Sequence, residues 1–175
     1  MVSSALGVGC GIAVTPLVYA NIALNAAGPI AALAIVGAYC FAPALGLAVL
    51  RRPGTGILTG LVAGLVQVPV TPFGWQMILT ALIWALPLEL VFLVTRYRLW
   101  GTSFFVVAGA IACALAAVTS VPAYQLGDFA VPVVVLALAV QPLSGAVATL
   151  LAKLLSDRLA RAGVGPNLRP VEHRG

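Results

Sequence analysis

The chain has 175 residues, of which 62% are hydrophobic and 7% charged, and its formal net charge is +5. Its mean hydropathy is +1.14. Soluble domains carry about 25% charged residues, so this composition excludes a water-soluble globular protein.

Six hydrophobic segments follow one another along the chain. A bilayer-spanning helix needs about 20 mostly apolar residues, and these segments match that length. They do not alternate apolar and polar residues as the strands of a membrane β-barrel do. The predicted spans are, in chain order, residues 3–24, 30–50, 54–70, 74–95, 102–123 and 129–155. We therefore predict an all-α integral membrane protein with six transmembrane helices in one domain, residues 1–157, and a basic cytoplasmic tail, residues 158–175.

The nine Lys and Arg residues form three clusters, one after every second segment. Arg51 and Arg52 form the first, Arg96 and Arg98 the second, and the remaining five lie near the C-terminal end. Short cytoplasmic loops accumulate Lys and Arg, whereas short translocated loops lack them. The pattern predicts that both termini are cytoplasmic. Basic residues at the membrane border indicate contact with anionic lipid headgroups and argue against nucleic-acid binding.

The residues needed for catalysis or for a resident cofactor are scarce. The single histidine, His173, lies in the polar tail, and the turn at residues 51–56 lacks the Gly-Lys-Ser/Thr of a phosphate-binding loop. Cys10, Cys40 and Cys113 fall in different segments without CxxC spacing, which favours apolar packing. No two carboxylates are placed as an acid/base pair within the membrane; they are Glu89, Asp128, Asp157 and Glu172. We expect no enzyme, no metal site and no cofactor.

Small residues recur every four positions in two segments. This spacing places them on one helix face, where two backbones can approach closely. In the third segment Gly56, Gly60 and Gly64 predict packing inside the molecule. The first segment has two such faces, Ser3/Gly7/Gly11 and Ala5/Gly9/Ala13. One could pack internally while the other binds a second protein.

Polar and aromatic residues inside the spans or at their outer ends indicate a small-molecule pocket that opens outward. Buried polar groups are costly in a membrane and are often functional, and aromatic rings with a few amides suit a small ligand. The candidate substrate-binding residues are Asn25, Tyr39, Gln67, Trp75, Trp84, Glu89, Tyr124 and Gln141.

Structural roles remain open for several of these candidates. Trp75 and Tyr124 could belong to the aromatic belt at the membrane interface. Glu89 could pair with Arg96, two turns further along the same helix face. The amides at positions 67 and 141 could simply form hydrogen bonds between helices.

Several motifs resemble the YkoE-type substrate-binding subunit of energy-coupling factor (ECF) transporters. They are Arg51-Arg-Pro-Gly-Thr-Gly, Gly60-Leu-Val-Ala-Gly-Leu-Val-Gln67, Phe73-Gly-Trp75, Glu89-Leu-Val-Phe-Leu-Val-Thr-Arg-Tyr97-Arg, Leu143-Ser-Gly-Ala146 and Leu159-Ala-Arg-Ala-Gly-Val164. The resemblance extends over about residues 28–164.

The resemblance implies a membrane subunit that captures thiamine or its hydroxymethylpyrimidine precursor from outside a bacterial-type cell. It further implies a transmembrane coupling protein, docked on the small residues of the first helix, and two cytoplasmic ATPases. Partner ATPases would explain how a transport protein can lack a nucleotide-binding loop.

Three positions depart from the family pattern. The family typically has Glu where this chain has Gln67, and Arg where it has Gln141. On the fourth helix Gln-Gly-Leu-Gly-Ala-Glu is replaced by Trp84-Ala-Leu-Pro-Leu-Glu89. A carboxylate can bind an aminopyrimidine with charge assistance, whereas Gln cannot. Thiamine-like ligands remain the first expectation, because Trp84 can stack on a pyrimidine or engage a thiazolium cation.

Two other functions are left open by the sequence. A stand-alone secondary transporter would usually show inverted repeats or several buried ionisable groups, and Glu89 is the one candidate group here. In a structural or regulatory membrane subunit, Gln67 and Gln141 would only hold helices together.

Overall fold

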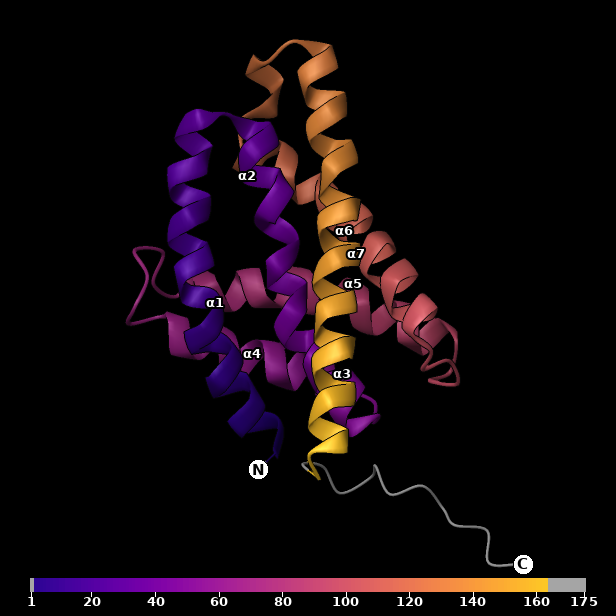
Figure 1. Ribbon diagram of the computed structural model, residues 1–175. Coiled ribbons are helices and arrows are strands. Elements are labelled where there is room, and N and C mark those ends of the chain that lie inside the picture. Colours follow the sequence, from indigo (N-terminus) through magenta and orange to yellow (C-terminus); the bar gives the residue numbers. More distant parts are fainter. Residues whose placement is uncertain (1, 164–175) are drawn as a thin grey trace, which may run out of the picture.

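The structure is a computed structural model, and it describes residues 2–163. Within this range the regular elements are helical (Figure 1). They are α1 (Val2–Ala27), α2 (Pro29–Val36), the 3₁₀ helix η1 (Gly37–Cys40), α3 (Phe41–Leu50), α4 (Thr55–Gln67), α5 (Gln76–Val94), α6 (Thr102–Ala123), the 3₁₀ helix η2 (Leu126–Asp128) and α7 (Val131–Arg161).

The predicted order of hydrophobic segments is confirmed, with one segment shorter than expected. In the described part of the chain, five helical stretches are long and apolar enough to cross a membrane: α1, the combined segment Pro29–Leu50, α5, α6 and α7. The other, α4, is apolar but has only 13 residues. At 1.5 Å per residue it is about 20 Å long, against about 30 Å for a bilayer core.

The last helix is longer than the predicted span. It ends at Arg161, so residues 158–161 of the predicted tail continue α7. Arg158 and Arg161 lie in its last turn, where cations interact favourably with the helix dipole. Residues 164–175 of that predicted tail lie outside the described residues.

A short 3₁₀ turn interrupts the second span between α2 and α3. Pro43 has no N–H group, so the helical hydrogen bond to the carbonyl of Tyr39 is lost, and the four residues before Phe41 adopt the tighter helix. The Gly37 N–H donates to Ser144 Oγ on α7 at 3.0 Å. A Cβ at position 37 would lie 2.3 Å from the backbone nitrogen of Gly145. The interrupted segment therefore packs closely on α7.

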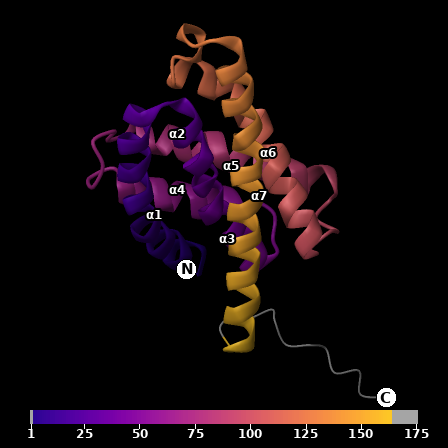
Figure 2. The same cartoon turned by 45° about the horizontal axis from the view of Figure 1, so that its top comes forward.

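Small residues also bring the other helices together. Gly60 and Gly64 of α4 face Ala85 and Ala81 of α5, which confirms the predicted internal packing of the third segment. Figures 1 and 2 both show α6 and α7 side by side, and these two helices are in contact. The same figures show α4 and α5 crossing behind α2 and α3.

Two apolar clusters form the core. The first surrounds Phe92, whose ring lies 5.0 Å, centroid to centroid, from the rings of Phe104 and Phe105. The second contains Trp84 with Cys40 and Cys113, whose sulfur atoms are 3.5 Å apart. Both cysteines are free and buried, as expected for apolar packing residues.

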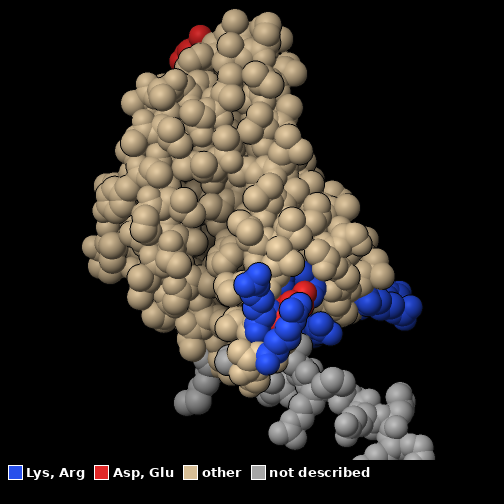
Figure 3. Space-filling view, viewed as in Figure 1, with Lys and Arg blue, Asp and Glu red and all other residues tan. Residues whose placement is uncertain are grey.

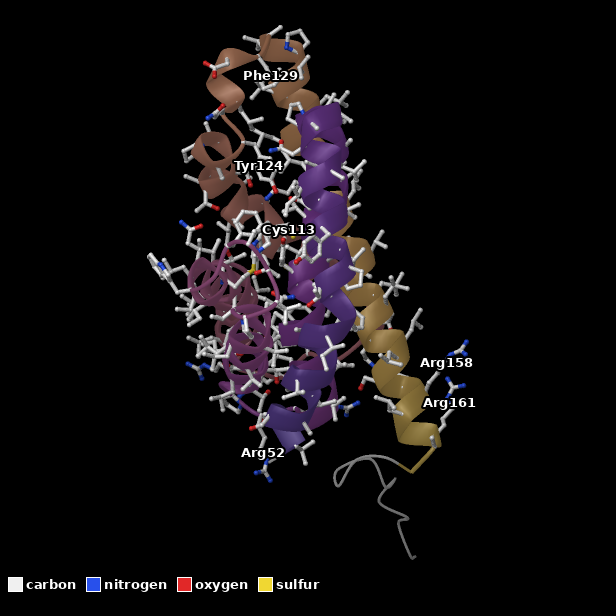
Figure 4. All side chains as sticks on the ribbon, turned by 90° about the vertical axis from the view of Figure 1, so that its left-hand side faces the viewer. Arg52, Cys113, Tyr124, Phe129, Arg158 and Arg161 are labelled. Carbon is white, nitrogen blue, oxygen red and sulfur yellow. The ribbon has the colours of Figure 1, made fainter. Side chains whose placement is uncertain are left out.

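Basic residues gather at one end of the molecule. In Figure 3 most of the visible face carries no charge, and Lys and Arg cluster toward its lower end. Figure 4 shows Arg52, Arg158 and Arg161 at that end, with Tyr124 and Phe129 toward the other. The N-terminus and the end of α7 lie at the basic end as well (Figure 1). The described structure thus has the two-ended charge distribution that the sequence predicts.

Candidate substrate-binding site

A cavity of about 630 Å³ lies at the end of the bundle opposite the basic loops. Its walls come from the end of α1, from α2 and η1, from the start of α5 with the preceding loop, and from the end of α6. Pockets for small ligands typically measure about 300–1,000 Å³. The lining residues are Asn21, Ile22, Asn25, Val36, Tyr39, Phe73, Gln76, Met77, Thr80, Ile83, Trp84, Thr119, Ser120, Ala123 and Tyr124.

Aromatic side chains form one wall of this cavity. Tyr39 of η1 and Trp84 of α5 are stacked, with ring centroids 6.0 Å apart and planes 21° apart. The break in the second span places Tyr39 here. On α5, Gln76, Thr80 and Trp84 are spaced by four residues and share one helix face. Trp84 is 5% exposed and Tyr39 is half-buried, so the Tyr39 ring is the more accessible part of this wall for a ring-shaped ligand.

A buried amide connects three elements at the cavity. Asn21 Nδ2 donates to the carbonyl of Ala32 at 2.8 Å, and the Tyr124 hydroxyl donates to Asn21 Oδ1 at 3.0 Å. Burial raises the pKa of the Tyr124 phenol above its ordinary value. The network fixes α1 against α2 and against the residue that follows α6.

Other polar side chains of the lining are accessible to a ligand. The amides of Asn25 and Gln76 are exposed at the cavity, and each provides both donors and an acceptor. Ser120 is buried in the wall. The sequence analysis identified Asn25 but missed Asn21, Gln76 and Ser120. The four-residue spacing from Gln76 to Trp84 was the signal that could have found Gln76.

The structure brings four of the eight predicted substrate-binding residues to the cavity: Asn25, Tyr39, Trp84 and Tyr124. The other four lie outside its lining. Gln67 borders an adjoining void of about 20 Å³, and its amide donates to the Gly11 carbonyl at 3.4 Å. Trp75 is 66% exposed. Gln141 is fully buried in α7, and neither polar atom of its amide has a partner among the described residues.

Glu89, the fourth of these residues, caps the start of α4 near the basic end. Its side chain is buried, with 6% exposure. Oε1 also accepts a hydrogen bond from the Tyr97 hydroxyl at 2.7 Å. The other donors are backbone N–H groups at the start of α4: Gly54 at 2.7 Å, Gly56 at 3.0 Å and Ile57 at 3.3 Å. A carboxylate at a helix N-terminus is favoured by the unpaired N–H groups and the helix dipole.

The suggested pairing of Glu89 with Arg96 is wrong. In residues 2–163, the ion pair is Lys153–Asp157, and the carboxylate of Glu89 is taken by the α4 cap and by Tyr97. Burial and the hydrogen bond to this carboxylate raise the pKa of Tyr97 to about 12. Through these hydrogen bonds, Glu89 connects the Arg51–Gly54 turn to the α5–α6 loop.

The two small-residue faces of α1 have different environments. Gly7 and Gly11 are buried against α4, and a Cβ at Gly7 would lie 2.6 Å from Val62 Cβ. Ser3, on the same face, is half-buried. The second face is exposed, and no atom lies within 4 Å of a Cβ built at its central glycine. This exposed face consists of Ala5, Gly9 and Ala13.

Residues 1–116 match the model of a protein family described as the permease component of ABC-type cobalt transport systems. The chain belongs to this family. This permease component is 26% identical over 148 residues to a Bacillus subtilis (strain 168) protein named putative HMP/thiamine permease protein YkoE. The alignment covers 83% of the present chain and 74% of that relative.

The fold of this permease component is also that of a solved structure, described as the crystal structure of an S-component of an ECF transporter. The TM-score is 0.87 at 24% identity, over 93% of this chain and 84% of the other. The resemblance to YkoE-type substrate-binding (S) components is thereby confirmed. The chain is a multi-pass membrane protein and a transport subunit, not an enzyme.

Proposed function

We propose that this S component captures thiamine or its hydroxymethylpyrimidine precursor at the outer face of a bacterial-type plasma membrane. The observation that carries the proposal is the cavity of about 630 Å³, in which the stacked Tyr39 and Trp84 lie beside accessible amides. An aminopyrimidine is planar and carries both donors and acceptors, so it matches a stacking wall with amides nearby. The relative named as an HMP/thiamine permease supports the same ligand class.

The orientation follows from the two ends of the bundle. The basic residues that follow α3, follow α5 and lie in the last turn of α7 face the cytoplasm, as the charge rule for short loops requires. Both termini then lie on the cytoplasmic side, and the cavity opens outward. A ligand bound there still has to cross the bilayer, and the motion that achieves this comes from the partners of the S component.

These partners are a transmembrane coupling protein and two cytoplasmic ATPases. The coupling protein docks on the exposed α1 face that Ala5, Gly9 and Ala13 form, because small residues let a partner helix approach closely. The Gly7/Gly11 face is already covered by α4.

Co-purification tests this docking face. Gly9→Leu, where a larger side chain meets no atom of the S component, is expected to abolish recovery of the coupling protein while ligand binding is retained. Ala114→Leu, which adds a side chain of the same size at an exposed position of α6, is the control and is expected to retain the partner. Recovery of the complex with Gly9→Leu would contradict the assignment.

Ligand-dependent thermal stabilisation of the purified protein tests the proposed substrate. A ligand at 100 times its dissociation constant adds about 2.7 kcal/mol of stability. Thiamine or hydroxymethylpyrimidine is expected to raise the melting temperature, and unrelated vitamins are not.

Two tryptophans provide a matched pair of variants for this assay. Trp84→Ala removes the stacking ring and is expected to weaken binding at least tenfold. Trp75→Ala removes a tryptophan that is 66% exposed outside the cavity and is expected to leave affinity unchanged. Equal losses in both variants would show that the ligand does not bind at the Tyr39–Trp84 wall.

A further inference from the structure

The described residues that line the large cavity include no Asp, Glu, Lys, Arg or His. Its polar groups are amides and hydroxyls, such as those of Asn21, Gln76 and Ser120, and the remainder is aromatic or aliphatic. The adjoining void is also lined by uncharged residues, among them Gln67. A ligand in this cavity meets dipoles and ring faces but no formal charge.

The charged side chains elsewhere in the described chain do not place a charge in the cavity. Glu89 is on the same helix as Trp84, but its carboxylate is bound by the α4 N–H groups and Tyr97 near the basic end. The arginines within residues 2–163 lie after α3, after α5 and in the last turn of α7, away from the cavity. Asp128 is exposed in η2 and does not belong to the lining.

From this lining we infer that the site selects an uncharged ring compound. This inference rests on the proposed function. It identifies the ligand as the neutral hydroxymethylpyrimidine, in preference to thiamine, which carries a permanent positive charge, or to a phosphate ester. Transfer of a charged group from water into a cavity within a membrane domain is unfavourable unless an opposite charge accompanies it. Neutral donors and acceptors have no such requirement, because amides and hydroxyls can satisfy them.

Two kinds of interaction could oppose this selection, and the geometry limits both. A cation can bind the face of Tyr39 or Trp84, but this contact offsets only part of the cost of removing a charge from water, whereas a neutral ring stacks on the same surface without that cost. A divalent metal ion, the cargo named in the family description, needs carboxylate, imidazole or thiolate ligands. Within residues 2–163, no three His, Cys, Asp or Glu residues are grouped to hold a metal ion.

The inference is tested by measuring dissociation constants of the purified full-length S component for four probes: hydroxymethylpyrimidine, its phosphate ester, thiamine and Co²⁺. Hydroxymethylpyrimidine is expected to bind at least ten times more tightly than thiamine or the phosphate ester, and Co²⁺ is expected not to compete. Thiamine binding as tight as that of hydroxymethylpyrimidine overturns the inference while the proposed function stands. Tighter binding of Co²⁺ or of the phosphate ester overturns both.

A charge introduced by one atom exchange sharpens the test. Gln76→Glu places a carboxylate in the cavity wall and is expected to shift the thiamine-to-hydroxymethylpyrimidine affinity ratio at least tenfold toward thiamine. Gln125→Glu adds the same charge at an exposed position outside the lining and is the control, with no shift expected. An unchanged ratio in Gln76→Glu counts against the inference.

A different set of binding results would contradict the proposed function. If none of the three pyrimidine compounds binds but an uncharged ring vitamin added as a fifth probe does, the proposed substrate is wrong and the selection by charge holds. If only charged compounds bind, the selection by charge is wrong.

Discussion

Removal of the Glu89 carboxylate is expected to destabilise the protein strongly while leaving the substrate cavity in place. Glu89→Ala leaves the N–H groups of Gly54, Gly56 and Ile57 and the Tyr97 hydroxyl without their acceptor. The side chain is 6% exposed, so water cannot replace the carboxylate at each of these donors.

The size of the effect follows from these contacts. A hydrogen bond to a charged group contributes about 1.5–3 kcal/mol. The four contacts share one carboxylate and three of them are only partly buried, so their sum overstates the loss. Breaking a buried charged network typically costs about 3–5 kcal/mol. For a chain of this size each kcal/mol shifts the melting temperature by about 2–4 °C, which gives a decrease of about 10 °C.

Thermal unfolding in one detergent, followed by intrinsic fluorescence, measures this decrease. Glu89→Gln retains one acceptor oxygen and is expected to melt between the wild type and Glu89→Ala. Asp128→Ala removes an exposed carboxylate and is the control, with a melting temperature within about 2 °C of the wild type. A Glu89→Ala protein that melts within the same 2 °C would refute the capping role. A folded Glu89→Gln protein that has lost ligand affinity would instead support the sequence-based prediction that Glu89 binds substrate.

Two further predictions concern close packing and pH. Gly37→Ala is expected to lower the melting temperature, because the added Cβ would lie 2.3 Å from the Gly145 nitrogen. Overpacking of this kind costs about 1–3 kcal/mol. Gly127→Ala, with open space around its Cβ, is the control. The raised pKa of Tyr97, about 12 in the folded protein against an ordinary value of 10, predicts stability that is complete below pH 10 and is lost as the pH rises toward 12. In Tyr97→Phe this part of the alkaline decrease in melting temperature is expected to disappear, and an unchanged pH profile would contradict it.

The hydrophobic segments and the basic clusters could be predicted because they depend on local sequence. Burial in lipid requires long apolar runs, and the charge rule acts on short loops, so both signals lie within a few tens of residues. The small-residue face of α4 was predicted for the same reason, since four-residue spacing defines a helix face. The resemblance to a known family added the transport role, which composition alone does not specify.

The features that were missed depend on contacts between distant segments. Glu89 accepts a hydrogen bond from Gly56 at the start of α4, 33 residues earlier in the chain, and hydropathy does not indicate this pairing. The polar residues Gln67 and Gln141 looked equivalent to Asn25 in sequence. Only the packing shows that Gln67 borders the small void, that Gln141 is fully buried, and that Asn25 is exposed to the cavity.

The shortness of α4 has a consequence for the lipid around the protein. A helix of 13 residues is about 10 Å shorter than an average bilayer core, and the loop that continues it exposes Val70, Phe73 and Trp75. Each ångström of hydrophobic mismatch costs a fraction of a kcal/mol, which the bilayer reduces by thinning locally. We therefore expect the bilayer beside α4 to be locally thinner near the cavity mouth. Such thinning shortens the path of a water-soluble ligand to the cavity, so we expect the occupancy of the site to depend on acyl-chain length.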